Sequence, residues 1–324
     1  MILLYRMEMQ QNTDSKHANP FPFNNLFLIK GFVTGKNEWW MYLCGFFAAM
    51  LGYSLFQYIT YLPLVAFARS NGVTITLENI SQLYNPDFIG MNRSLMLAFF
   101  GGMFIFTLLF LWLVLKFIHH KTLTSIITGF EKIRWNRYFF AFAVWGGLIV
   151  ISTLISYLIA PEELEIRFNA GKFAILFLTV IIFLPIQTAT EELLFRSYLM
   201  QGLGMAFKNA IAPLIITSVM FGLMHGTNPE IRAHGLLIMM PYYICFGAFL
   251  GMLILLDEGA ELAMGIHCAN NLVSSLLVTS KNSVLQTDAI FYTSVENPSA
   301  EFLTWIILAS ICFFILFKKY KLNN

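Results

Sequence analysis

Charged residues are scarce in this chain of 324 residues. Asp, Glu, Lys and Arg make up 12% of it, whereas 58% of the residues are hydrophobic and 16% are aromatic. Average soluble domains carry about 25% charged residues, so the composition excludes an ordinary soluble domain and predicts a membrane protein. The net charge of +2 comes from cations scattered at the ends of apolar segments. This pattern argues against a nucleic-acid partner.

Paired cysteines and metal signatures are also missing. The four cysteines lie singly in apolar segments without CxxC spacing, so neither a disulfide framework nor a cysteine metal cage is expected. No HExxH motif occurs, which is the signature of helical zinc peptidases. The first residues, MILLY, are too short for the apolar core of a signal peptide, and a polar stretch follows them. We expect no metal and no other cofactor.

Long apolar segments are what the chain has instead. About 20 apolar residues span the hydrocarbon core of a membrane. Eight segments approach or exceed that length: 39–66, 94–118, 138–160, 173–207, 209–225, 235–256, 261–280 and 302–317. The fourth is too long for one straight span, so Pro185 is expected to kink or split it. The predicted fold is all-α, with about eight transmembrane helices in a single bundle.

The same pattern divides the chain into four consecutive parts. Residues 1–38 are predicted to be a cytosolic or surface segment, and 39–172 to hold three membrane helices with a basic cytosolic loop. Residues 173–280 form a core with polar groups inside apolar segments. Residues 281–324 form an extramembrane loop and a last helix with a basic tail. Because Lys and Arg gather in the two terminal segments and the basic loop, both termini are predicted to be cytosolic.

An unusual group of charges lies in the most apolar part of the chain. Glu191, Glu192 and Arg196 follow the uncharged run 173–187. Ionised groups at membrane depth cost at least ~2.5–3.5 kcal/mol each and usually face a protein interior or a water-filled cavity. Glu192 and Arg196 are four residues apart and can pair on one helical face. Glu191 points about 100° away, so its carboxylate is available as a general acid or base.

Two further polar patterns occur in neighbouring apolar segments. Phe221 and His225 are four residues apart in FGLMH, and His267 and Asn271 are four apart in HCANN. His267 and Asn271 therefore share a helical face, and each can donate a hydrogen bond to a developing oxyanion. Asn270, one step around the helix, is expected to pack beside them or to support them. Two histidines, an asparagine and an unpaired glutamate together favour a reaction site over isolated contacts between helices.

These three patterns resemble the motifs of a known family. EELLFR at 191–196 resembles the EExxxR motif of the CAAX protease and bacteriocin-processing (CPBP) family, the intramembrane glutamic endopeptidases that include CAAX prenyl proteases. FGLMH resembles the FxxxH motif of that family, and HCANN resembles its HxxxN motif, in the same order and at similar spacing. The resemblance covers about residues 173–280. It implies an integral membrane endopeptidase that acts on a membrane-bound or lipidated peptide within the lipid bilayer.

The resemblance also implies a role for each matching position. Glu191 and His225 would activate a water molecule for attack on a peptide carbonyl, without a metal. His267 and Asn271 would form the oxyanion hole, and Phe221 would support the site. The second glutamate and the arginine of the first motif would keep the structural ion pair that helix geometry predicts. The expected location is the cytoplasmic membrane of a bacterium.

Three other functions remain open at this point. A zinc enzyme could use Glu191, His225 and His267 as ligands with water as the fourth. A non-enzymatic immunity or scaffold protein would use these polar groups only to hold helices together. A transporter could relay protons through glutamate and histidine, although no inverted repeat is visible in the sequence.

The expected depths of the two histidines conflict with a shared site. His225 ends the fifth apolar segment near the outer face, whereas His267 begins the seventh near the inner face. A common site therefore requires a break at Pro185, Gly222 or Pro241, or helices that extend beyond these segments.

Overall fold

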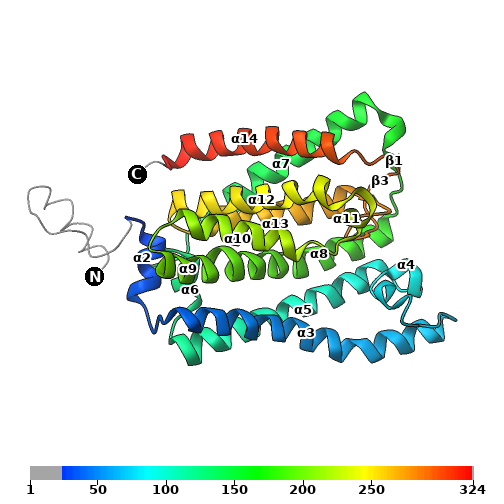
Figure 1. Ribbon diagram of the computed structural model, residues 1–324. Coiled ribbons are helices and arrows are strands. Elements are labelled where there is room, and N and C mark those ends of the chain that lie inside the picture. Colours follow the sequence, from blue (N-terminus) through cyan, green and yellow to red (C-terminus); the bar gives the residue numbers. More distant parts are fainter. Residues whose placement is uncertain (1–23, 323–324) are drawn as a thin grey trace, which may run out of the picture.

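The computed structural model describes residues 24–322, which form a bundle of helices with roughly aligned axes (Figure 1). Six of the described helical segments are long and apolar enough to cross a membrane. They are Trp39–Ser70 (α3), Arg93–Leu113 (α5) continued by Val114–His119 (η2), Trp135–Ile159 (α7), Ala170–Phe207, Leu236–Asp257 (α12) and Pro298–Tyr320 (α14). The prediction of an all-α, polytopic membrane protein is confirmed.

Two shorter apolar helices complete the bundle: Ile211–Met224 (α10), of 14 residues, and Glu261–Leu277 (α13), of 17 residues. At 1.5 Å per residue α10 is roughly 21 Å long, which is less than the ~30 Å of a hydrocarbon core. All eight predicted apolar segments are thus helical, except that the last three residues of the seventh, 278–280, form a strand. A count of eight membrane crossings stays a prediction.

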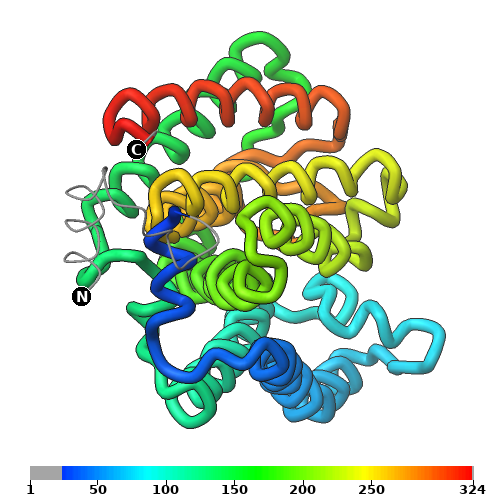
Figure 2. The backbone as a smooth tube through the Cα atoms, turned by 60° about the vertical axis from the view of Figure 1, so that its left-hand side comes forward, coloured from blue at the N-terminus to red at the C-terminus, as the bar shows by residue number. Residues whose placement is uncertain are grey.

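The helices are arranged as a central group with a pair on either side (Figures 1 and 2). α3 packs against α5 on one side, and α7 and α14 lie on the other, with α10, α12 and α13 between them. The first described helix, Leu26–Val33 (α2), and the end of α14 lie at the same end of the bundle. The side of the membrane on which this end lies stays a prediction.

The fourth apolar segment is one continuous helix. Ala170–Glu191 (α8) passes directly into a π-helical stretch, Glu192–Leu199 (η4), and then into Met200–Phe207 (α9). Pro185 lies inside α8 and does not split it, so the helix tolerates the loss of one backbone hydrogen bond. The irregularity comes instead at η4, which carries the second glutamate and the arginine of the first motif. Such π-helical stretches occur frequently at functional sites.

A small sheet and several short helices connect the long helices. Glu165–Ile166 (β1) pairs antiparallel with Phe291–Thr293 (β3), which pairs parallel with Val278–Ser280 (β2). The sheet lies at the end of the bundle away from α2 (Figure 1), and the sequence did not predict it. The short helices are Ile80–Gln82 (η1), Pro86–Ile89 (α4), Leu123–Ile127 (α6), Pro161–Glu163 (η3) and Pro229–His234 (α11).

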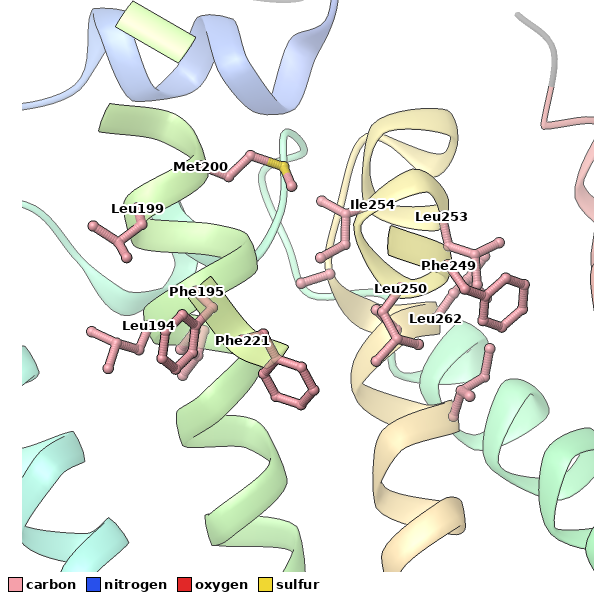
Figure 3. Close-up of a cluster of buried hydrophobic side chains, with 14 of the residues drawn as sticks. Leu194, Phe195, Leu199, Met200, Phe221, Phe249, Leu250, Leu253, Ile254 and Leu262 are labelled. Atoms are coloured by element: carbon pink, nitrogen blue, oxygen red, sulfur yellow. The ribbon is translucent and has the colours of Figure 1, made fainter. Parts of the chain in front are cut away.

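Aromatic side chains fix α10 against η4 and α12. Phe195 and Phe221 are 4% and 1% exposed, and their ring centroids are 6.0 Å apart in an edge-to-face arrangement. Figure 3 shows these two rings together, with Leu250 and Leu262 among the neighbouring side chains. Contacts of this kind hold helices together by van der Waals packing in a membrane. They place the second motif beside the first.

A group of ion pairs, here named the turn cluster, joins the start of α7 to the turn between α12 and α13. Arg134 Nη2 lies 2.7 Å from Glu261 Oε2 and 2.9 Å from Asp257 Oδ2, and Arg137 pairs with the other oxygen of Asp257. Both carboxylate side chains are 1% exposed. These four residues fix the end of the bundle where the described chain begins and finishes.

Candidate active site

A cavity of about 600 Å³ lies among α3, α5, α8, α10, α12 and α13. Five of the residues singled out from the sequence line it: Glu191, Phe221, His225, Asn270 and Asn271. The other three are buried beside it, with exposed fractions of 3% or less: Glu192, Arg196 and His267. The structure thus gathers residues of all three motifs in one region.

The two adjacent glutamates have different partners. Glu192 Oε1 accepts hydrogen bonds from Arg196 Nη1 at 2.7 Å and from His267 Nδ1 at 2.6 Å. Glu191 Oε1 accepts one from Gln187 at 2.7 Å, and its Oε2 lies 3.5 Å from His267 Nε2. The ion pair expected from the spacing of four residues is present. His267 lies between the two carboxylates, a contact that the sequence did not predict.

Glu191, Glu192, Arg196 and His267 are here named the site cluster. Several of its polar atoms are buried without a hydrogen-bond partner in the described part of the chain: Glu191 Oε2, Glu192 Oε2, and Nε and Nη2 of Arg196. The Arg196 guanidinium lies 3.6 Å over the centroid of the Phe221 ring, which is a cation–π contact. An unsatisfied buried polar group costs about 1–3 kcal/mol, and more when charged. The site cluster therefore has unused bonding capacity.

A chain of amide hydrogen bonds positions the Glu191 carboxylate. Asn271 Nδ2 donates to Gln187 Oε1 at 3.0 Å, and Gln187 in turn donates to Glu191. Asn270 Nδ2 donates to Asn271 Oδ1 at 3.1 Å, and Trp145 Nε1 donates to Asn270 Oδ1 at 3.2 Å. Sequence reasoning missed Gln187 and Trp145. Gln187 could have been found, because it stands four residues before Glu191 on the same helix.

His225 is held so that one ring nitrogen has no hydrogen-bond partner among the described residues. Its Nδ1 lies 2.8 Å from the backbone carbonyl of Phe221, and since a carbonyl can only accept, Nδ1 carries the proton. In the neutral ring Nε2 is then the nitrogen with the lone pair. The ring stacks on Tyr243, with centroids 4.4 Å apart, so its plane is fixed as well.

The two histidines lie close together, because both of their rings contact the ring of Phe221. The ring centroid of Phe221, one turn before His225, is 6.0 Å from that of His267. None of the three breaks suggested by the sequence is responsible, because α8, α10 and α12 each continue through Pro185, Gly222 or Pro241. The physical reason is tertiary packing, because Phe221, in the last turn of α10, packs against His267 of α13.

Of the two expected oxyanion donors, Asn271 faces the cavity and His267 does not line it. Asn271 lines the cavity, and within residues 24–322 one of the two hydrogens on its amide nitrogen is engaged, by Gln187. His267 turns both ring nitrogens toward the glutamates. Within residues 24–322, no group of three or more His, Cys, Asp or Glu side chains is arranged to hold a metal ion.

Residues 170–273 match the family model described as type II CAAX prenyl endopeptidase Rce1-like. This core is similar to that family. The match includes all eight residues singled out from the sequence and confirms the resemblance to CAAX proteases. Together with the six membrane-length helices among the described residues, it supports an integral membrane hydrolase of the CAAX protease type.

The similarity to one curated protein extends beyond residues 170–273. The chain is 29% identical over 271 residues to the uncharacterized protein YyaK of Bacillus subtilis (strain 168). The aligned part covers 83% of this chain and 88% of YyaK. No solved structure matches the chain.

Proposed function

We propose that this protein is an intramembrane glutamic peptidase that hydrolyses a membrane-associated peptide with a water molecule activated by Glu191 and His225. The observation that carries the proposal is Glu191 Oε2, which is buried without a hydrogen-bond partner in the described part of the chain. Its carboxylate lines the same cavity as His225, whose Nε2 is the free acceptor. A positioned carboxylate and imidazole are the groups that a general-base mechanism requires.

The reaction requires a definite movement of protons. Glu191, oriented by Gln187, and His225 take a proton from water as its oxygen forms a bond to the peptide carbonyl carbon. The carbonyl oxygen becomes an oxyanion. When the carbon–nitrogen bond breaks, the stored proton passes to the leaving amine, so that a carboxylic acid and an amine are formed.

Asn271 and His267 are the proposed oxyanion donors. Asn271 faces the cavity with an unused amide hydrogen. His267 contributes when doubly protonated: Nδ1–H donates to Glu192, while Nε2 lies 3.5 Å from Glu191, too far for a strong hydrogen bond.

The walls of the cavity suit a substrate that is part of the membrane. Beyond the polar groups, the cavity is lined by apolar side chains from α3, α5 and α8, which include Met50, Leu97, Phe104 and Phe183. We therefore propose a membrane-bound peptide, with or without an attached lipid, as the substrate. The proposed location is a bacterial cytoplasmic membrane with both termini in the cytosol.

The test is cleavage of a fluorogenic, C-terminally lipidated peptide by purified protein in detergent. Wild type, Glu191→Ala and wild type with excess zinc chelator are run side by side. The expected result is cleavage that is lost in the variant and unaffected by the chelator. Chelator sensitivity would instead favour a zinc enzyme. Undiminished cleavage by Glu191→Ala would overturn the proposed role of this carboxylate.

A further inference from the structure

A second carboxylate, Glu230, lines the same cavity. It belongs to α11, at the end of the bundle near the small sheet (Figure 1). The described residues that line the cavity include two acidic side chains, Glu191 and Glu230, and no lysine or arginine. The remaining polar lining groups are neutral amides and hydroxyls together with His225. The cavity thus carries acidic groups that no lining cation balances.

One oxygen of Glu230 is held in place and the other is unused. The hydroxyl of Tyr243 donates to Glu230 Oε1, and Asn228 Nδ2 donates to that hydroxyl at 3.0 Å. Glu230 Oε2 is buried and has no hydrogen-bond partner in the described part of the chain. A buried carboxylate oxygen of this kind is costly unless a donor satisfies it.

Cations near Glu230 do not supply that donor. His234, on the same short helix, pairs with Glu296 at 2.7 Å, and Arg232 is exposed. Burial raises the pKa of the Glu230 carboxyl, which the hydrogen bond from Tyr243 opposes. A cation entering the cavity would stabilise the ionised form.

We propose that Glu230 is a specificity-determining residue that binds a cationic group of the substrate, a lysine or arginine side chain or a free ammonium. This inference rests on the proposed peptidase function. It defines the substrate class further, as a membrane-associated peptide with a basic residue near the scissile bond. The same two carboxylates repel a peptide that presents an acidic group at this position.

The Tyr243 side chain connects the proposed cation subsite to the proposed reaction site. One face of its ring stacks on His225, with centroids 4.4 Å apart, and its hydroxyl binds Glu230. The Tyr243 side chain therefore contacts both Glu230, the proposed subsite, and His225, the proposed base.

The test measures peptide binding to the Glu191→Gln variant. In this variant cleavage is slowed, and Glu230 is the acidic side chain that remains among the described lining residues of the cavity. The probes are three fluorescent peptides on one lipid-linked alanine scaffold, with lysine, norleucine or glutamate at every second position. Their dissociation constants are compared for full-length Glu191→Gln protein in detergent and for the same protein with Glu230→Gln added. Because Glu296 lies outside the cavity, Glu296→Gln provides a matched loss of charge in the same region.

The lysine peptide is expected to bind about ten- to a hundred-fold more tightly than the norleucine peptide, the range for a hydrogen bond to a charged group. This ratio should fall to near one with Glu230→Gln and persist with Glu296→Gln. Glu230→Asp, which keeps the charge, should keep most of the preference, and it tests the charge even if the glutamine variant folds poorly.

A lysine preference that survives in Glu230→Gln, or equal binding of all three peptides, would overturn the role of Glu230. If wild type nevertheless cleaves the lipidated peptide in a Glu191-dependent manner, the proposed peptidase function stands and only this inference fails. Absence of binding by all three peptides would contradict both.

Discussion

Two groups of buried charges occur in this bundle, and they differ in how completely their polar atoms are bonded. In the turn cluster, Arg134 donates to both of its acidic partners and Arg137 donates to one of them. No polar atom of this cluster is buried without a partner in the described part of the chain. In the site cluster three of the four residues have such atoms.

The difference separates a structural cluster from a functional one. Both clusters contain carboxylates that are almost fully buried, so burial and charge alone do not distinguish them. A buried polar atom without a partner lowers stability, and where several lie together beside a cavity they are available to a substrate or a reacting water. The turn cluster has no such capacity and lies outside the cavity.

The largest effect on stability is expected for Glu192→Ala. The change removes the acceptor shared by Arg196 and His267, both of which are 3% exposed or less. Breaking a buried ion pair by removing one partner costs about 3–5 kcal/mol. We expect a large drop in the melting temperature in detergent and low accumulation in the membrane. Normal expression with no activity would contradict a mainly structural role for Glu192.

A large effect on catalysis without a comparable effect on folding is expected for Asn271→Ala. Loss of one oxyanion donor lowers kcat by roughly 10²–10³-fold. The substitution also frees Gln187 Oε1, but the hydrogen bond from Gln187 to Glu191 can persist. Steady-state cleavage and melting temperature are measured on the same preparation. Full activity of this variant would exclude Asn271 as an oxyanion donor.

In the turn cluster, Glu261→Gln should have the opposite profile. The variant weakens the contacts with Arg134, whose side chain is 16% exposed and can be partly rehydrated. The expected loss of stability is therefore smaller than for Glu192→Ala, about 1–3 kcal/mol. Activity per folded molecule should equal that of wild type. A loss of activity beyond the loss of folded protein would show that the turn cluster is not purely structural.

The smallest effect concerns Lys121, a buried side chain near the same end of the bundle. Its Nζ donates to the carbonyl of Gly31 at 3.0 Å and to the Tyr42 hydroxyl at 2.6 Å. Burial lowers the pKa of Lys121 to about 7, below the value of about 10.4 in an unfolded chain. Between these values the unfolded chain binds the additional proton, so stability rises with pH.

Melting temperatures of wild type and Lys121→Met at pH 7, 8 and 9 measure this contribution. We expect wild type to gain stability over this range relative to the variant. The variant also loses two hydrogen bonds, which shifts its melting temperature at every pH, so the comparison uses the slopes. Equal slopes would show that Lys121 keeps an ordinary pKa in the folded protein.

Local features of the fold and the site could be predicted from the sequence. The apolar segments predict the long helices, and the spacing of Glu192 and Arg196 predicts their ion pair, because both depend on residues close in the chain. The contact of His267 with Glu192 joins residues 75 positions apart and depends on how α13 packs against the first motif. The closeness of His225 to His267 also follows from tertiary structure, since hydropathy gives the extent of α10 but not how its end packs against α13.

The central claim is tested most directly by the rate of peptide cleavage per folded molecule in Glu191→Gln and Glu261→Gln, measured side by side in detergent. Each variant loses one buried negative charge, one beside the cavity and one in the turn cluster. We predict that Glu191→Gln folds normally and loses about 10²–10⁴-fold in rate, the usual contribution of a general base, while Glu261→Gln keeps the wild-type rate. Equal rates in the two variants would contradict the assignment of Glu191 as the catalytic carboxylate.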